Sequence, residues 1–311
     1  MSTESVSAMS NPINRILFEK PNLPELSQQY TVVDMHFHSA HSDGRNTIDE
    51  IAEHAEMMGI GVAITDHNEI QGALEMAAHK NVLSIPGIEV TSSEGAHILA
   101  YFNDVDNLTR FYDQDIAPHM GSDTMNSTNI DMETIIQCAQ QNLGITIFPH
   151  PFCGVYTGIA NQHLEKEKLK NLLDHVDGVE VINSENLNKW NLKSALLGFN
   201  LDKAISGGSD GHSLYQLGKV VTYAACPNDR SSFLATLKNG QNRVIGKEID
   251  MLHKVQSNGI KLRSNFKNYP QLMEKNISYS RKVIHIKSKM IRDRVKTRFH
   301  DGIRKNASFW K

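Results

Sequence analysis

The sequence predicts an α/β fold, a closed or nearly closed β/α barrel, on two observations. Seven short apolar segments, most of them rich in β-branched residues, follow one another from residue 30 to residue 212, and helical patterns separate most of them. Most of these segments also end in, or within one residue of, Asp, His, Glu or Asn. Strands that alternate with helices imply parallel strands with the helices outside, and seven repeats suit a barrel of roughly 200 to 250 residues. The polar strand ends would then meet on one face.

The predicted strands lie in TVVDMHFH, GVAITDH, VLSIPGIEV, AHILAYF, GITIFPHP, GVEVIN and KAISGGSDGH. Between them, NTIDEIAEHAEMMG predicts a helix with its N-cap at Asn46 or Thr47 and with Gly59 after its last turn. DMETIIQCAQQNLG is built in the same way, with Gly144 as its stop. Two further helices are expected in HLEKEKLKNLLDHV and NLKSALLGFN.

The chain divides by composition into three parts. Residues 1–29 are a polar lead-in segment, residues 30–246 hold the predicted barrel, and residues 247–311 form a basic C-terminal extension. Within the barrel, residues 103–130 lack a clear strand and are expected to form an insertion over the face where the strand ends meet.

Charge is distributed unevenly over the chain. Residues 254–311 hold 16 of the 32 Lys and Arg and three acidic residues, a charge of about +13, whereas the remainder carries about −16. An acidic body suits a site for metal cations, and a basic tail suits phosphate-bearing partners or an anionic surface.

The tail has the pattern of a basic amphipathic helix, because its apolar residues recur every four positions at Ile291, Val295, Phe299 and Ile303, joined by Ile284. One interpretation is a helix packed on the barrel by its apolar stripe. The others are binding to an anionic membrane surface or to a nucleic acid backbone.

Neither a membrane span nor secretion is expected, because no run of about 18 apolar residues occurs and the N-terminus lacks the apolar centre of a signal peptide. We expect a cytoplasmic protein, with peripheral membrane association through the tail as an alternative. Cys138, Cys153 and Cys226 are odd in number and widely spaced, which predicts free thiols in a reducing compartment.

The stretch VVDMHFHSAHSDG at residues 32–44 bears most directly on function. Side chains alternate along a strand, so Asp34, His36 and His38 share one face. Alone, such an HxH pattern is more commonly a solvent-facing polar edge than a metal site. Across all the strand ends, however, nine side chains of metal-ligand type recur: His36, His38, Asp43, His67, Glu89, His97, His150, Asp210 and His212.

The series HFHSAHSDG, TDH, GIEV, AHILAYF, FPHP and GGSDGH resembles the PHP superfamily, the polymerase and histidinol phosphatase domain of metal-dependent phosphoesterases, over about residues 30–246. The resemblance implies a distorted (β/α)7, TIM-like barrel with two or three divalent metal ions. By this resemblance His36 and His38, with Glu89 and Asp210, hold one ion. Glu89 bridges to a second ion held by His97 and His150, and Asp43, His67 and His212 hold a third.

Mixed imidazole and carboxylate ligands suit zinc, manganese or iron. Such ions activate water as hydroxide and bind phosphate oxygens, so the expected activity is hydrolysis of a phosphomonoester or a small phosphodiester. Phosphorylated small molecules and short nucleic acids are the expected substrates. The alternatives are a nuclease acting on short oligonucleotides or nucleotide bisphosphates, and a non-catalytic metal-binding PHP module.

Other residues near the motifs are candidates for contacts to the substrate or to the metal ligands. Asp34 is either a hydrogen-bond partner of one of the two histidines or a buried Asp bonded to the backbone. Glu180 and Asn183 end the GVEVIN strand and are expected to face the pocket. Arg110 is the sole arginine of the insertion, and His41 is an alternative ligand to Asp43.

Overall fold

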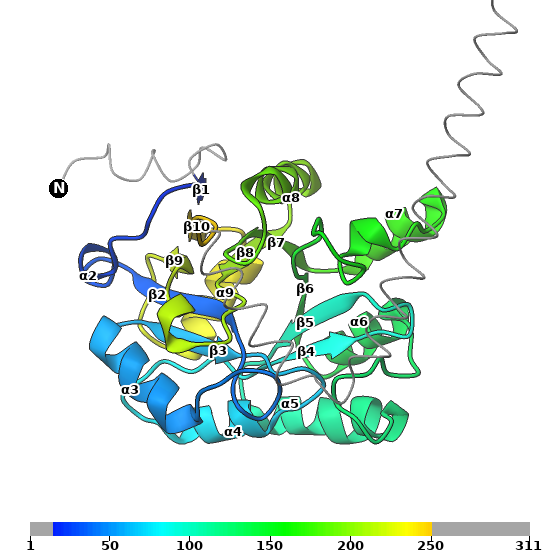
Figure 1. Ribbon diagram of the computed structural model, residues 1–311, viewed down its shortest axis with the longest axis horizontal. Helices are drawn as coiled ribbons and strands as arrows, with labels where there is room; N and C mark the ends of the chain where they lie inside the picture. The colour runs from blue at the N-terminus through cyan, green and yellow to red at the C-terminus, as the bar shows by residue number, and fades with distance from the viewer. Residues whose placement is uncertain (1–14, 251–311) are drawn as a thin grey trace, which may run out of the picture. The chain divides into compact units, whose positions relative to one another are not determined.

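The computed structural model describes residues 15–250, which fold as a mixed α/β domain (Figure 1). Ten strands form two five-stranded sheets, in the orders β1-β10-β9-β2-β3 and β4-β5-β6-β7-β8. The first sheet contains β1 (Ile16–Leu17), β10 (Arg243–Gly246), β9 (Val220–Ala224), β2 (Thr31–Phe37) and β3 (Gly61–Ile64). The second contains β4 (Gly87–Thr91), β5 (His97–Tyr101), β6 (Ile145–Phe148), β7 (Gly178–Asn183) and β8 (Ala204–Gly208).

The helices lie around the outside of the strands (Figure 1). They are α2 (Leu23–Leu26), α3 (Ile48–Met58), α4 (Gln71–Ala78), α5 (Val105–Phe111), α6 (Met132–Gln141), α7 (Lys166–His175), α8 (Asn188–Leu201) and α9 (Arg230–Lys238). Short turns of π or 3-10 helix occur at η3 (Tyr112–Ile116), η4 (Ala117–His119), η5 (Ile159–Asn161) and η6 (Leu214–Gln216). None of the helices between residues 15 and 250 combines the length and apolarity needed to cross a bilayer.

All seven predicted strands are present as β2 to β8, and the mixed α/β class is confirmed. The predicted closed barrel is not seen, because the ladders of residues 15–250 form two sheets rather than one closed sheet. Single bridges join the two sheets, from His67 to Glu89 and from Phe37 to Gly211. These bridges still bring the ends of β3 and β4, and of β2 and β8, close together.

The prediction that the strands are parallel is wrong for part of the fold. β5 runs antiparallel to β4 and β6, and β9 runs antiparallel to β2 and β10. The link between β4 and β5 contains only residues 92–96, whereas a parallel crossover needs about a dozen residues. The short link therefore forces these two strands into a hairpin.

Helix α3 begins where the capping pattern predicts. Of the two N-cap candidates the structure selects Thr47, whose hydroxyl accepts from the Glu50 amide, while the Glu50 carboxylate accepts from the Thr47 amide. Gly59 ends the helix in the left-handed region, with φ of 66°. Helix α6 begins at its N-cap Asp131, and its C-cap is Asn142, two residues before the predicted stop at Gly144.

The segment 103–130 contains no strand and forms α5, η3 and η4 before it reaches the strand ends. There the Asn68 side-chain amide donates to the carbonyls of Thr124 and Asn126, and the Thr128 amide donates to Thr91. Part of the segment thus lies beside the residue that follows His67. The predicted basic helix lies in residues 251–311, outside the described part of the chain.

Candidate metal centre

The loop after β2 folds back on itself and places Asp43 near the two histidines of that strand. The amides of Ser42 and Gly44 both donate to the Ser39 carbonyl. A Cβ atom at residue 44 would lie 2.3 Å from the His38 carbonyl oxygen, so this close approach requires glycine. The turn is fixed because the buried carboxylate of Asp66 accepts from the Ser39 amide at 2.7 Å and from the hydroxyls of Ser39 and Ser42.

Strand β8 brings Asp210 beside β2 by a second close approach. The Asp210 amide donates to the His36 carbonyl at 2.8 Å, and a Cβ atom on Gly208 would lie 2.4 Å from His36 Cβ. Asp210 and His150 both have positive φ, 52° and 30°. Such backbone strain in non-glycine residues is typical of functional sites, where the surrounding structure holds it in place.

Glu89 lies at the centre of the cluster, buried among five imidazoles from four separate segments. Its Oε1 is 2.8 Å from His97 Nδ1 and 3.2 Å from His150 Nε2. Its Oε2 is 3.1 Å from His67 Nδ1, 3.4 Å from His38 Nε2 and 3.5 Å from His36 Nε2. Burial raises the pKa of this carboxyl, but the charges of His97, His67 and His36 hold the pKa well below its ordinary value. Glu89 is thus an ionised carboxylate that faces five nitrogens.

Two further carboxylates flank this centre. Asp43 Oδ1 is 3.1 Å from His212 Nε2, 3.7 Å from His38 Nδ1 and 3.9 Å from His67 Nε2. Asp210 Oδ1 is 3.2 Å from His38 Nε2 and 3.6 Å from His36 Nε2. All nine side chains expected from the sequence therefore lie in one connected cluster.

Within this cluster three groups have ligand atoms close enough to hold a metal ion, and they overlap. They are His38, Asp43, His67 and His212; His36, His38 and Asp210; and His67, Glu89 and His97. This grouping resembles the expected division, except that His38 and His67 each belong to two groups.

The donor atoms fit divalent cations. His38 Nδ1, His67 Nδ1, His150 Nδ1 and Glu89 Oε2 are buried and make no hydrogen bond, although Glu89 Oε2 is near three imidazole nitrogens. Buried polar groups are costly when they lack a partner, and a cation would satisfy both the imidazole lone pairs and the carboxylate. A mixed set of imidazole and carboxylate ligands is suited to zinc, manganese or iron.

Glu180 supports the cluster from behind rather than facing the pocket. Its Oε1 is 3.0 Å from His36 Nδ1, and its Oε2 accepts from the His150 amide at 2.8 Å and from Asn183 Nδ2 at 2.9 Å. Asn183 Nδ2 also lies 3.2 Å from Asp210 Oδ2. Both residues are almost fully buried, so they orient His36 and Asp210 instead of meeting a substrate.

Asp34 bonds to the main chain and not to a histidine ring, which agrees with the second of its two interpretations. Its Oδ1 accepts from the amides of Ser209 and His36, and its Oδ2 accepts from the Gly218 amide. Asp34 thereby ties β2 to the segments that follow β8.

Two other candidates lie away from the cluster. Arg110 is on the exposed surface of α5, where its guanidinium donates to Asn107. His41 pairs with Glu75 at 3.0 Å, so the structure favours Asp43 over His41 as a ligand.

A pocket of roughly 320 Å³ opens onto the cluster. Seven of the nine candidate ligands line it, and its remaining wall consists of Cys153, Gly154, Val155, Thr157, Glu185, Asn186 and Trp190. A Cβ atom on Gly154 would lie 2.5 Å from the Trp190 ring, so the indole packs directly on this backbone. Sequence patterns did not point to Trp190, because a lone Trp near the start of a helix is usually part of the core.

Comparison with known proteins bears on the family. Residues 34–178 match the PHP domain. The match ends before Asp210 and His212, which lie beyond it. No curated protein matches the chain.

Several solved structures share the fold at low sequence identity. One is a two-domain protein from Bacteroides vulgatus that contains a predicted PHP-like metal-dependent phosphoesterase, with a TM-score of 0.52 and 18% identity over 78% of this chain and 73% of that one. Another is the lesion-specific endonuclease Q from Pyrococcus furiosus, with a TM-score of 0.57 and 18% identity over 69% of this chain and 57% of that one. A third is endonuclease Q in complex with a 27-mer duplex that has an abasic lesion at the active site. Its TM-score is 0.56, with 17% identity over 70% of this chain and 60% of that one. Residues 34–178 thus match the PHP domain, and these solved structures show that the fold is shared.

Proposed function

We propose that this chain is a hydrolase of phosphate esters, a metal-dependent phosphoesterase that holds two or three divalent ions. The observation that carries the proposal is the Glu89 carboxylate, buried among five imidazole nitrogens and lacking a hydrogen bond at Oε2. A buried cluster of this kind at the floor of a pocket is typical of an active site.

The distances support the ligand division implied by the family resemblance. His36 and His38 with Glu89 and Asp210 would hold one ion, and Glu89 with His97 and His150 a second. Asp43, His67 and His212 would hold the third. Manganese, zinc and iron all suit these ligands.

Divalent ions bound in such a cluster lower the pKa of a water ligand and neutralise phosphate oxygens. The protein's own side chains would supply orientation and shielding. Glu180 and Asn183 hold His36 and Asp210 in place, while Trp190 and Val155 form part of the pocket wall.

A nuclease is the second candidate, and the composition of the pocket favours a phosphodiester. Among the described residues, no Lys or Arg lines the pocket, and Glu185 adds a carboxylate to its wall. A diester carries one negative charge and a monoester about two, so the diester meets less repulsion there. Endonuclease Q, which shares the fold, was solved with a DNA duplex.

A non-catalytic metal-binding module is the remaining alternative. The cytoplasmic location and the anionic or membrane partner of the basic tail stay predictions from the sequence.

The test compares hydrolysis of p-nitrophenyl phosphate, bis-p-nitrophenyl phosphate, a nucleoside 3',5'-bisphosphate and a short oligonucleotide by protein loaded with manganese or zinc. The products are p-nitrophenol from the first two compounds, phosphate from the bisphosphate and shortened strands from the oligonucleotide. We expect His36→Ala, His67→Ala and Asp210→Ala to lower the rate by at least about a hundredfold, because each removes a metal ligand. His79→Ala is the matched control, since His79 pairs with Asp49 on the surface. Full activity in all three ligand variants would show that the catalytic assignment is wrong.

A further inference from the structure

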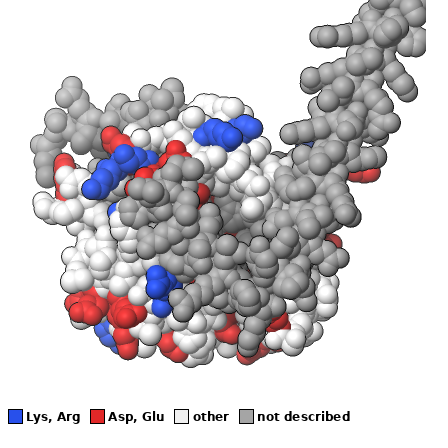
Figure 2. All heavy atoms as spheres, viewed as in Figure 1, with Lys and Arg blue, Asp and Glu red and all other residues white. Residues whose placement is uncertain are grey.

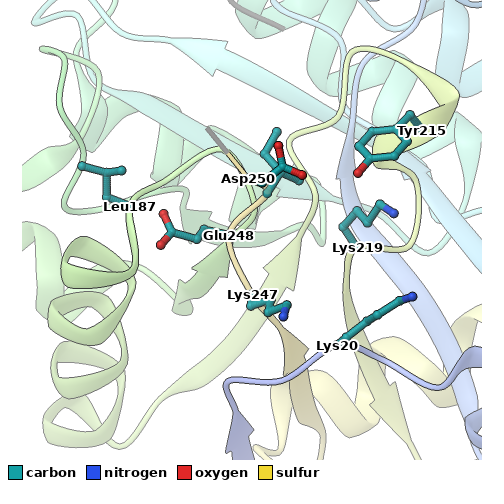
Figure 3. Close-up of a pocket in the computed structure, with 8 residues that line it drawn as sticks. Lys20, Leu187, Tyr215, Lys219, Lys247, Glu248 and Asp250 are labelled. Carbon is teal, nitrogen blue, oxygen red and sulfur yellow. The ribbon is translucent and has the colours of Figure 1, made fainter. Parts of the chain in front are cut away.

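A second pocket, of roughly 560 Å³, adjoins the metal pocket. It is lined by Lys20, Leu187, Tyr215, Lys219, Lys247, Glu248, Ile249 and Asp250 (Figure 3), and we call it the lysine pocket. The two pockets share a wall, because Glu185 and Asn186 line the metal pocket and the next residue, Leu187, lines the lysine pocket.

Hydrogen bonds fix this wall to the metal ligands. The Gln216 side chain accepts from the His212 amide at 2.9 Å and donates to Glu185, and its neighbour Tyr215 faces the lysine pocket. The Ile249 amide donates to the Ser184 carbonyl at 2.9 Å, which holds the segment 247–250 against the same wall. These bonds connect the residues of the lysine pocket to those of the metal pocket.

Three ammonium groups gather in the lysine pocket. Within residues 15–250, no carboxylate lies within 4.0 Å of the ammonium groups of Lys20, Lys219 or Lys247. Lys219 is half-buried and stacks on Tyr215, with its Nζ 4.2 Å from the ring centroid. Burial lowers the pKa of Lys219, the charge of Lys20 lowers it further, and Asp250 partly offsets both. Like charges held this close favour an anionic ligand between them.

Two carboxylates line this pocket, and they differ in position. Asp250 lies near enough to Lys219 to raise its pKa, whereas Glu248 points away from the lysines. In Figure 3 the Glu248 carboxylate turns towards Leu187, on the opposite side from the three ammonium groups. On the face of the molecule shown in Figure 2, acidic side chains gather over α3, and others lie beside the blue patch at upper left. An anion can thus approach the lysines without meeting Glu248.

The two pockets are complementary in charge. No Lys or Arg lines the metal pocket among the described residues, so that pocket offers no side-chain cation to a second phosphate of the same substrate. The lysine pocket supplies three cations on the other side of a shared wall. This arrangement suits a polyanionic chain with regularly spaced phosphates better than a small monoester.

We propose that the lysine pocket binds a backbone phosphate of single-stranded DNA while a neighbouring phosphodiester of the same strand lies at the metal cluster. This inference rests on the proposed function and specifies its substrate class. Tyr215, 46% exposed, offers a ring edge beside which a base can pack.

Binding tests the pocket without relying on catalysis. The probe is a fluorescein-labelled single strand of about ten nucleotides, followed by fluorescence anisotropy from about 50 to 200 mM salt. The proteins are the full chain, its Lys20→Gln/Lys219→Gln/Lys247→Gln variant, and a control with the same charge change, Lys166→Gln/Lys170→Gln/Lys238→Gln. The control lysines are exposed and line neither pocket.

We expect the pocket variant to bind more weakly by roughly tenfold, and the slope of log K against log salt to become smaller by about 0.7 for each phosphate that the variant no longer neutralises. The decrease in DNA affinity of the control variant should be less than half of the decrease seen in the pocket variant. Equal decreases in the two variants would mean that the lysines act only through net charge, and the inference would be wrong.

Cleavage separates this inference from the proposed function. With bis-p-nitrophenyl phosphate, which cannot reach a second pocket, the pocket variant should match the unmodified chain in kcat and KM. With a single strand of about ten nucleotides, its KM should rise by roughly tenfold. If no protein hydrolyses either compound, the proposed function fails, and the anisotropy comparison still decides whether the lysine pocket binds DNA.

Discussion

At the residue scale, the positions of the metal-binding side chains depend on carboxylates that would not themselves touch a metal. Glu180 contacts the His36 ring, the His150 amide and the Asn183 side chain with its two oxygens. Asp66 fixes the turn that presents Asp43. Both carboxylates are buried, and their partners lie far away in the sequence, 144 residues for the pair of His36 and Glu180.

Replacing Glu180 by Gln should weaken metal binding. The amide keeps the shape of the side chain, but its NH2 group must face either the His36 ring or the donors from His150 and Asn183. One hydrogen bond therefore becomes a contact between two donors. We expect zinc affinity, measured by isothermal titration calorimetry, to fall by about ten- to a hundredfold. Glu165→Gln, at an exposed position without a side-chain cap bond, is the control. Unchanged zinc affinity in Glu180→Gln would contradict an orienting role.

The cysteines should differ in reactivity. Burial and the neighbouring Asp115 raise the pKa of the Cys138 thiol to about 11, so roughly one molecule in a thousand carries the thiolate at pH 8. Burial also raises the pKa of Cys153, but the neighbouring His150 imidazole brings its pKa below the ordinary value. Iodoacetamide at pH 8, followed by mass spectrometry, should therefore label Cys153 first in metal-free protein. Faster labelling of Cys138 would show that this order is wrong, and unfolded protein, in which both thiols are exposed, is the reference.

At the element scale, the start of α4 packs directly against the residues that fix the loop after β2. A Cβ atom on Gly72 would lie 2.3 Å from Asp66 Oδ2 and 2.8 Å from Ser39 Oγ. Neither atom can move without breaking the hydrogen bonds that hold the loop. Helix α4 therefore packs so closely on Asp66 that only glycine fits at this position.

Gly72→Ala should lower the free energy of unfolding by about 1–3 kcal/mol, the usual cost of overpacking. It should also weaken metal binding, because Asp43 moves with the loop. Urea denaturation and a zinc titration measure the two effects. Gly121→Ala is the control, since no atom lies within 4 Å of a Cβ at that position. A variant as stable as the original chain would show that the loop adapts at no cost.

The elements that the sequence predicted are those with a strong local pattern. β2 to β8 are apolar, largely β-branched segments, most of which have a polar residue at or near one end, and the ends of α3 follow local capping rules. β1, β9 and β10 were missed, because β1 has two residues and the other two end in no motif. The direction of β5 was predicted wrongly, because it depends on the short link after β4 and not on the residues of the strand itself.

At the scale of the whole molecule, the nine candidate ligands were predictable from the sequence, and the structure brings them together. Their surroundings were not predictable, because Glu180, Asp66 and Trp190 acquire their roles through contacts between distant segments. Periodicity reports which face of an element a residue takes, whereas these contacts depend on how the elements pack.

Metal binding should stabilise the whole domain. Ions that bind only the folded chain add about 2.7 kcal/mol at a concentration one hundred times Kd. For a domain of this size, that corresponds to a rise in Tm of about 5–10 °C. Differential scanning fluorimetry with zinc, manganese or a chelator measures the shift, and His36→Ala should respond less. Equal shifts in the two proteins would place the stabilising ions elsewhere.

The order of the metal-binding residues along the chain has a consequence for biosynthesis. The histidines of β2 come first in the chain, but the cluster also needs Asp210 and His212. Asp34 on the same strand needs the Gly218 amide as its hydrogen-bond donor. During translation, about 180 residues must leave the ribosome after His36 before these partners exist. A nascent chain thus exposes histidines that cannot yet form their site, and the correct ions can be acquired only when synthesis of the domain is almost finished.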